Sequence, residues 1–281
     1  MCDCLFSDAP APLRHKAARE LTRLLLGGFL RLRAPLYYRY CALLADEDDD
    51  VREPAEYYVT CGLTTDAIYH HFVECVLYYN HEEKDRIDFD DRQLIYDVML
   101  QRMSIVQKLN IQCRLAREVL EHAADLTDEG DEELPPPINA ALLDTITLLC
   151  GPRMKLPKKS HKSTEANDID ELQERVTNNI VSRKMKITVA EVLVPAVLRL
   201  HSRLKSRGGQ INTYLIHIAS DLLQDYEQEI KELFEDNTEL MKSIQLFQET
   251  IGLEVTFGNV RNLVTDTAPA EPDTPRAPRR R

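Results

Sequence analysis

Residues 34–80 place the strongest constraint on the fold, because they predict three consecutive amphipathic helices joined by very short connections. Their apolar side chains recur at intervals of three and four residues, which places them on one face of a helix with 3.6 residues per turn. We predict helices over Leu36–Asp46, Val51–Gly62 and Asp66–Asn80. Asp50 is predicted to cap the second helix, because its side chain can accept the free N–H groups of the first turn. No single helix can bury its apolar face alone, so antiparallel neighbours must stack.

One pattern recurs along the chain. An apolar residue and an arginine are followed at fixed spacing by an alanine and a second apolar residue, first from Leu13 and again from Val51, 38 positions later. This offset is close to the period of HEAT and armadillo helix pairs, roughly 40–47 residues. In that register Ala55 faces the neighbouring helix closely, and the chain begins on the second helix of a pair. We therefore expect a HEAT-type α-solenoid and a piece of a longer protein.

The rest of the sequence also favours an all-α fold, since alternating Val, Thr and Ile runs are rare. Helical spacing of apolar residues predicts eight more helices: Leu13–Leu26, Leu94–Met103, Val106–Leu126, Ile138–Cys150, Ile169–Met185, Val189–Leu204, Ile211–Phe234 and Leu240–Ile251. His81–Asp91 is predicted to be a loop. Pro195 is predicted to kink its helix or to mark its start, because proline lacks an N–H. Asp236 and Glu239 are predicted to cap the last helix.

Composition shifts divide the chain into four predicted parts. Residues 1–151 form HEAT-like repeats, 152–168 a basic flexible linker, 169–251 a C-terminal helical cap, and 252–281 a disordered tail rich in Pro and Arg. A segment with little apolar content cannot bury enough surface to offset its loss of conformational entropy, and the tail has such a composition.

Bulk properties exclude several classes of protein. The net charge of −12 argues against a protein that coats DNA over its whole surface, although local basic segments can still contact it. Seven cysteines, most of them on apolar helix faces, indicate reduced thiols in a cytosolic or nuclear protein rather than a disulfide scaffold. The longest apolar run, Leu24–Leu32, contains Arg31 and is too short to span a membrane. We expect no signal peptide and no membrane partner.

Two blocks of sequence resemble the D-type HEAT-repeat subunit of the condensin complex, most closely its condensin II form. The first runs from L-T-R-L-L-L at Leu21 through V-R-E-P-A-E-Y-Y at Val51 to H-F-V-E-C-V-L-Y-Y-N, which ends at Asn80. The second, more specific block joins E-V-L-V-P-A-V-L-R-L at Glu191 to L-L-Q-D-Y-E-Q-E-I-K-E-L-F at Leu222. Pro54 departs from the pattern, where a small residue is expected, and the N-terminal HEAT array of the family is absent.

The resemblance implies a non-catalytic scaffold subunit in the nucleus and on chromosomes, where it would support mitotic chromosome condensation. It implies as partners the SMC ATPase subunits, the kleisin subunit and chromatin, through histone tails and DNA, and it places the ATPase sites on the partners. The alternative is an unrelated HEAT-repeat adaptor, such as a nuclear-transport or phosphatase scaffold. Neither interpretation requires a cofactor.

Catalytic motifs are missing from the sequence, which has no phosphate-binding glycine loop, no G-x-S-x-G and no H-E-x-x-H. A small helical metal hydrolase is the third alternative. Its ligands would come from four residues on one predicted helix: His70, His71, Glu74 and Cys75. The pairs lie four residues apart, which suits a metal, but no similar second pair occurs, so solvated side chains and a core cysteine explain them as well.

Acidic and aromatic residues are concentrated around the second predicted helix. The candidate patch consists of Asp46, Asp48, Asp49, Asp50, Tyr57 and Tyr58. Carboxylates beside exposed aromatic rings can hold a lysine-rich peptide such as a histone tail, through Coulomb attraction and cation–π contacts. Consecutive carboxylates also repel one another, so a cationic partner would relieve that repulsion. The alternative is a solvated turn beside tyrosines that pack between helices.

Basic residues are concentrated in the predicted linker and at the C-terminus. The linker candidates for DNA contact or nuclear targeting are Arg153, Lys155, Lys158, Lys159 and Lys162. A solvated linker is the alternative. The tail carries Arg276 and Arg279–Arg281, which allow the same two interpretations, and Thr274 precedes Pro275, a dipeptide that suits proline-directed phosphorylation.

Overall fold

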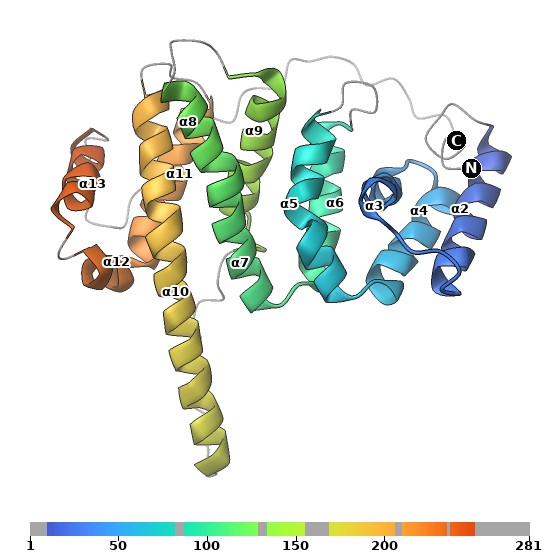
Figure 1. Cartoon of the computed structure of the whole chain (residues 1–281), viewed down its shortest axis with the longest axis horizontal. Helices are drawn as coiled ribbons and strands as arrows, with labels where there is room; N and C mark the ends of the chain where they lie inside the picture. Colours follow the sequence, from blue (N-terminus) through green and yellow to red (C-terminus); the bar gives the residue numbers. More distant parts are fainter. Residues whose placement is uncertain are drawn as a thin grey trace, which may run out of the picture.

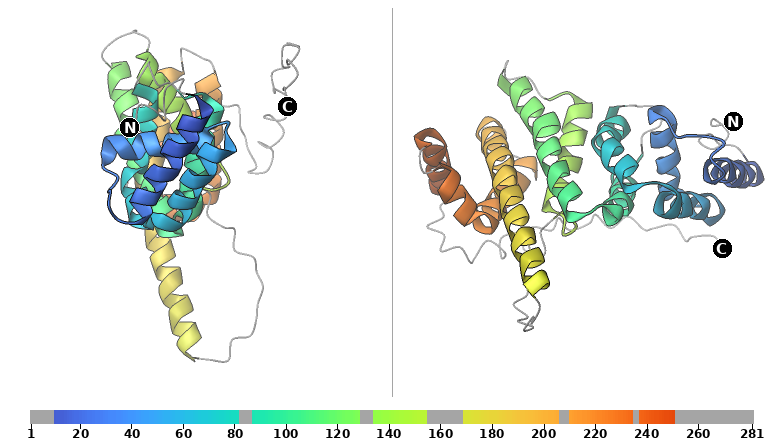
Figure 2. Two further views of the ribbon diagram at one scale, coloured as in Figure 1. Left: turned by 90° about the vertical axis from the view of Figure 1, so that its right-hand side faces the viewer. Right: turned by 60° about the horizontal axis from the view of Figure 1, so that its bottom comes forward.

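The chain folds as a stack of α-helices with no strand in any part that the structure describes (Figure 1). This computed structural model describes residues 10–81, 87–128, 134–154, 169–205, 210–234 and 237–250. Successive helices lie side by side along the long axis of the molecule, and a second view shows the same succession (Figure 2). The prediction of an all-α, HEAT-type solenoid is confirmed.

The described residues of the N-terminal half form five α-helices and two short irregular turns: α2 (Ala11–Leu26), α3 (Ala34–Ala42), η1 (Leu43–Ala45), α4 (Asp49–Tyr57), η2 (Tyr58–Gly62), α5 (Thr65–His81) and α6 (Phe89–Arg102). The segment η1 is a 3-10 turn, and η2 is a π-helical turn that continues α4. Pro54 is the sixth residue of α4, so the helix lacks the N–H that would normally bond the Asp50 carbonyl.

In the C-terminal half, the part that the structure describes forms seven α-helices and one π-helical turn: α7 (Ile105–Leu115), η3 (Ala116–Glu121), α8 (His122–Asp128), α9 (Pro136–Cys150), α10 (Ile169–Leu204), α11 (Gln210–Asp225), α12 (Glu227–Phe234) and α13 (Thr238–Thr250). A capping box starts α7, because the Ser104 side chain and the Gln107 side chain each bond the other's backbone N–H. The first part of α10 projects well beyond the body of the molecule (Figure 1).

Two apolar cores hold these helices together. The first joins α2 to α6 and takes in Ile111 and Leu115 of α7. The second joins the other face of α7, including Leu109, to α9, α10, α11, α12 and α13. Helices on both sides of residues 152–168 therefore share one core. The four-part division of the chain stays a prediction, but the described helices pack continuously across its first boundary.

Ala55 lies in the first core as the repeat register requires. Only 1% of its surface is exposed, and α4 packs against α2 at this level. The small side chain allows the two helices to approach closely, which explains why alanine recurs at the equivalent position, Ala17, in α2. Both alanines are buried.

Two predicted helix starts are wrong. Asp48, not Asp50, caps α4, since its Oδ1 accepts the Asp50 N–H at 3.1 Å. The predicted loop at 81–91 ends earlier than expected, because α6 already begins at Phe89. Asn237 bonds the Leu240 N–H at 3.2 Å in the first turn of α13, the position predicted for Asp236, which lies outside the described residues.

The two helices predicted on either side of residue 187 are one helix, α10, which continues through Pro195. Proline in a helix interior costs roughly 3 kcal/mol. Its neighbours Val194, Ala196 and Val197 are all buried in the second core, and this packing offsets the cost. The helix predicted over Ile211–Phe234 instead bends at Tyr226, between α11 and α12.

Candidate functional site

The acidic turn predicted as a peptide-binding patch is an ionic contact between α2 and α4. Asp46 pairs with Arg14, and Asp49 pairs with Arg52. His15 reaches two carboxylates of the turn: its Nε2 lies 2.5 Å from Asp48 Oδ2 and its Nδ1 lies 3.4 Å from Asp50 Oδ2. Four of the five consecutive carboxylates therefore have a basic neighbour from the same chain.

Helix geometry explains why α2 supplies these cations. Arg14 and His15 sit at the edge of the buried face of α2, so their side chains reach across to the start of α4. Arg19 follows one turn later and lies 3.9 Å from Asp50, with both side chains mostly exposed. The hydrogen bond from His15 holds the pKa of Asp48 below its usual value, because it stabilises the carboxylate form.

Basic side chains of α2 and α4 therefore already offset part of the repulsion expected among the carboxylates of the acidic turn. Tyr58 is also not exposed as predicted: it is 7% exposed and its ring packs edge-on against Tyr40. Tyr57 is 57% exposed. The side chains of Asp49 and Asp50 are 71% and 61% exposed and remain accessible to a partner. Binding of a basic peptide at this turn stays a prediction.

The other tyrosines of this region pack between helices. Tyr79 donates a hydrogen bond to the Tyr38 carbonyl at 2.7 Å, and Tyr40 shares a hydrogen bond with Thr22 at 2.7 Å. Burial raises the pKa of Tyr38 to about 12 and that of Tyr79 well above its usual value. These rings are part of the first core and join α3, α5 and α6, so they serve packing.

The four residues weighed as metal ligands on α5 point into different environments. Cys75 is fully buried in the first core, and burial raises its pKa well above the usual value for a thiol. His71 stacks on Tyr37, with ring centroids 4.7 Å apart, and Glu74 lies 3.3 Å from Arg114 of α7. The paired residues are four positions apart on one helix, as a metal site would require, but the four side chains do not converge on one point.

A different trio comes close together. Ligand-type atoms of His15, Asp48 and Asp50 lie within 4.8 Å of one another, a separation that a metal ion can bridge. Sequence reasoning missed it because His15 lies 33 residues from Asp48. The same His15 and Asp48 atoms bond each other, so the contact between α2 and α4 already accounts for them.

Of the predicted basic segment, only Arg153 belongs to the described residues. Its Nε lies 2.5 Å from Asp97 Oδ1 on α6. Lys155, Lys158, Lys159 and Lys162 lie outside the described residues, as do Thr274 and the C-terminal arginines. The DNA or targeting role of this segment therefore stays a prediction.

A buried polar network joins α5, α6 and α9, and it is the strongest electrostatic feature of the described chain. Arg92 donates to both carboxylate oxygens of Asp144, at 2.7 Å and 2.9 Å. Tyr96 and Asn80 donate to Asp144 Oδ2 at 3.0 Å and 2.7 Å. The side chains of Arg92 and Asp144 are 4% and 0% exposed. This set of partners fixes three helices relative to one another and has no opening for a substrate.

No helix among the described residues is long and apolar enough to cross a bilayer.

Comparison with known proteins gives a consistent result. A family profile described as condensin-2 complex subunit D3-like HEAT repeats matches residues 152–247. Condensin-2 complex subunit D3-L of Xenopus laevis is 20% identical over 264 residues, which cover 83% of this chain and 17% of that protein. Condensin-2 complex subunit D3 of Mus musculus is 21% identical over 272 residues, covering 86% of this chain and 18% of that protein.

A plant relative extends the comparison. Condensin-2 complex subunit CAP-D3 of Arabidopsis thaliana is 22% identical over 262 residues, covering 83% of this chain and 20% of that protein. The chain therefore spans about a fifth of the length of the curated relatives that it matches. No solved structure matches the chain.

Proposed function

Because the chain belongs to the condensin-2 subunit D3-like family of HEAT-repeat proteins, we propose that it is a non-catalytic scaffold segment of a condensin II complex. It would assemble with the SMC ATPase subunits and the kleisin subunit in the nucleus and support mitotic chromosome condensation. The observation that carries the proposal is the similarity over more than four-fifths of the chain to relatives whose names place them in that complex.

The fold supports a scaffold role on physical grounds. Helices stacked along one axis present long surfaces, and two continuous apolar cores keep those surfaces in fixed relative positions. The buried Arg92–Asp144 network adds a rigid joint between α6 and α9. We infer that the reaction chemistry of the assembly, ATP hydrolysis, lies on the partner subunits, since the sequence lacks a phosphate-binding glycine loop.

Two contacts with chromatin belong to this proposal. The exposed carboxylates of Asp49 and Asp50 would meet a basic histone tail, and the basic segment from Arg153 to Lys162 would meet DNA phosphates. Their opposite charges suit opposite partners. Thr274 is proposed as a site of proline-directed phosphorylation.

Affinity purification of the tagged full chain from mitotic cell extract tests the proposal. We expect the SMC ATPase pair and the kleisin to be recovered together in stoichiometric amounts. Recovery of nuclear-transport factors or of a phosphatase catalytic subunit in their place would favour the unrelated HEAT adaptor. Metal analysis of the same preparation separates both from a metal hydrolase, which would retain a stoichiometric metal ion.

A further inference from the structure

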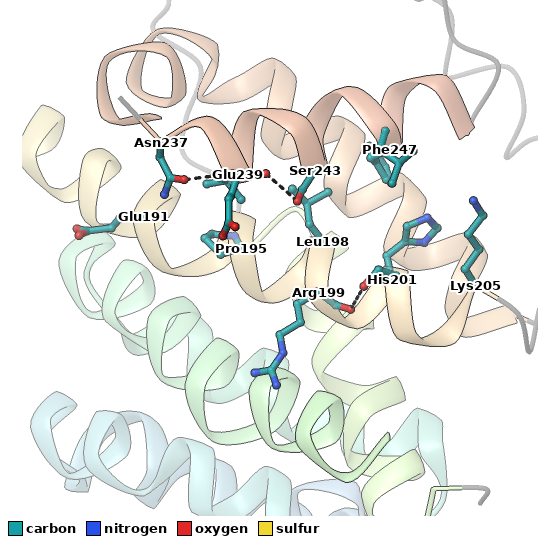
Figure 3. Close-up of a pocket in the computed structure, with 13 residues that line it drawn as sticks. Glu191, Pro195, Leu198, Arg199, His201, Lys205, Asn237, Glu239, Ser243 and Phe247 are labelled. Carbon is teal, nitrogen blue, oxygen red and sulfur yellow. Dashed lines mark hydrogen bonds between the residues drawn. The ribbon is translucent and has the colours of Figure 1, made fainter. Parts of the chain in front are cut away.

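A groove with a cavity of about 610 Å³ lies between α10 and α13 at the C-terminal end of the described helices (Figure 3). The two helices run in the same direction along it, with Glu191 and Asn237 at one end and His201 and Phe247 at the other. Neither helix fills the space between them, although both contribute to the second core.

The groove walls are mainly apolar. Leu198 and Pro195 line it from α10, and Leu240 and Phe247 line it from α13. Leu246 also lines the groove and is 63% exposed. Burying such a side chain would contribute about 25 cal/mol per Å² of apolar surface removed from water.

Two positions of α10 along the groove depart from ordinary helix hydrogen bonding or pairing, and one of them holds a buried acceptor without a donor. Pro195 has no N–H, so the Glu191 carbonyl does not receive the hydrogen bond that a helix normally supplies four residues later. The His201 ring is 5% exposed and bonds Asn212 Oδ1 through Nδ1 at 2.8 Å, while its Nε2 has no partner among the described residues. An acceptor left without a donor away from water costs about 1–3 kcal/mol.

The tautomer of His201 follows from this geometry. Because the Asn212 oxygen is an acceptor, Nδ1 carries the proton and Nε2 presents a lone pair. Burial lowers the pKa of His201, so the ring stays neutral at physiological pH. Ten residues separate the groove-lining Glu191 and His201 along α10, which corresponds to about 15 Å of helix. The unfilled length of the groove is therefore that of a short extended peptide.

The sequence directly after α13 has the pattern of such a peptide. Leu253-Glu254-Val255-Thr256-Phe257 alternates apolar and polar residues, and Gly252 precedes it. In an extended segment this alternation places three apolar side chains on one side. Five residues span about 13 Å, close to the length of the groove. Glycine permits the sharp turn that a reversal after Thr250 requires.

We propose that residues 253–257 of the same chain fold back antiparallel to α13 and fill this groove. Leu253, Val255 and Phe257 would enter between the helices, and a main-chain N–H of the segment would face the unpartnered Nε2 of His201. The end of α13 lies beside His201, so the connection needs only residues 251 and 252. The segment would become part of the helical cap, and the predicted disordered tail would begin after it.

Tryptophan fluorescence tests the proposal without interference, because the chain contains no tryptophan. In the full chain, Phe257→Trp is expected to emit at shorter wavelength and to resist quenching by acrylamide. Thr256→Trp is the matched control, since its side chain would point away from the groove and emit as in water. Equal emission and equal quenching of the two variants would overturn the proposal.

A second substitution locates the contact. Adding Leu246→Asp to the Phe257→Trp variant should shift its emission to longer wavelength, whereas adding Leu94→Asp on α6, another partly exposed leucine (48%), should not. Emission that depends on protein concentration would assign the groove to a second copy of the chain and overturn the proposal. So would a shift to shorter wavelength that appears only when a partner protein is added.

Amide hydrogen exchange provides a readout that does not alter the described helices. Val255→Asp should increase exchange in α13, because the docked segment would no longer cover it, while Thr256→Asp should leave exchange unchanged. Identical exchange in both variants would contradict docking of this segment even if the fluorescence differed.

Discussion

Replacing Asp144 by asparagine should destabilise the chain more than any substitution of an exposed carboxylate. Asp144 is the only counter-charge within hydrogen-bonding distance of the Arg92 guanidinium among the described residues, and both side chains are at least 96% buried. Asparagine has nearly the same shape but no charge, so the guanidinium would remain buried without a counter-charge. Removal of one partner of a buried ion pair typically costs about 3–5 kcal/mol. We expect a loss in this range for Asp144→Asn.

Urea unfolding of the full chain, followed by far-ultraviolet circular dichroism, measures the effect. The matched control is Asp125→Asn, which breaks a pair of similar length, 2.8 Å to Arg199, whose side chains are 62% and 43% exposed. Exposed pairs are worth about 1 kcal/mol or less. Because stacked helices can unfold in more than one step, amide exchange in α6 and α9 should report the loss locally.

A double variant separates the charge effect from loss of packing. Arg92→Met combined with Asp144→Leu removes both charges, and replacing a buried pair by apolar groups is often neutral. Tyr96 and Asn80 would still lose their acceptor, so we expect recovery of part of the loss, not all of it. A loss of unfolding free energy below about 1 kcal/mol for Asp144→Asn would refute the reasoning. So would a double variant whose loss exceeds the sum of the losses in its two single variants.

Three further predictions follow from buried or charged positions. Ala55→Phe should cost roughly 1–3 kcal/mol by overpacking the contact between α4 and α2, and an unchanged thermal midpoint would contradict the repeat register. Neutralising Arg153, Lys155, Lys158 and Lys159 together should leave helicity intact but reduce nuclear accumulation or salt-sensitive DNA retention, and no change in either would leave the solvated linker as the explanation. Burial lowers the pKa of His201 in the folded chain, so as pH falls below about 6.5 this histidine is protonated in the unfolded chain before it is protonated in the folded chain. The free energy of unfolding should therefore decrease from about pH 7.5 to about 5.5, and the decrease should be smaller in His201→Gln.

Helix positions were predictable because each core-facing stripe repeats with the helical period. The apolar residues of α5, for example Ile68, Phe72 and Val76, are all fully buried, as their spacing indicates. Boundaries were less predictable, because contacts between distant residues decide them. Asp48 rather than Asp50 caps α4, in the same turn that His15 of α2 holds. Similarly, the core around Val194 and Val197 keeps α10 continuous through a proline.

The electrostatic features could be predicted only in part. Asp144 is the only charged residue of α9, a mostly apolar helix, and such a residue usually indicates a buried partner. The identity of that partner was hidden, since Arg92 lies 52 residues away, between the predicted loop His81–Asp91 and the predicted helix Leu94–Met103. The contact of Arg14 and His15 with the acidic turn spans 32 and 33 residues. Spacing along one helix cannot reveal pairs between helices.

The contact between α2 and α4 changes how peptide binding at the acidic turn must be tested. A lysine-rich histone peptide would compete with Arg19 for Asp50, because the two side chains lie 3.9 Å apart and are both exposed. The gain from binding is therefore an exchange of ion pairs, with cation–π contact to Tyr57 adding about 0.5–1 kcal/mol at an exposed site.

Titration of such a peptide against three variants separates competition from general charge. Changing Asp48, Asp49 and Asp50 to Asn should weaken binding, and Arg19→Gln should strengthen it by removing the competitor. Lys16→Gln removes the same charge from the exposed face of α2 and serves as the control. If both single variants strengthen binding equally, only the overall field of α2 matters. Binding should also weaken as ionic strength rises, because the Debye length at 0.15 M is about 8 Å. Affinity that ignores both the carboxylates and the salt would mean that the turn serves only to join α2 to α4.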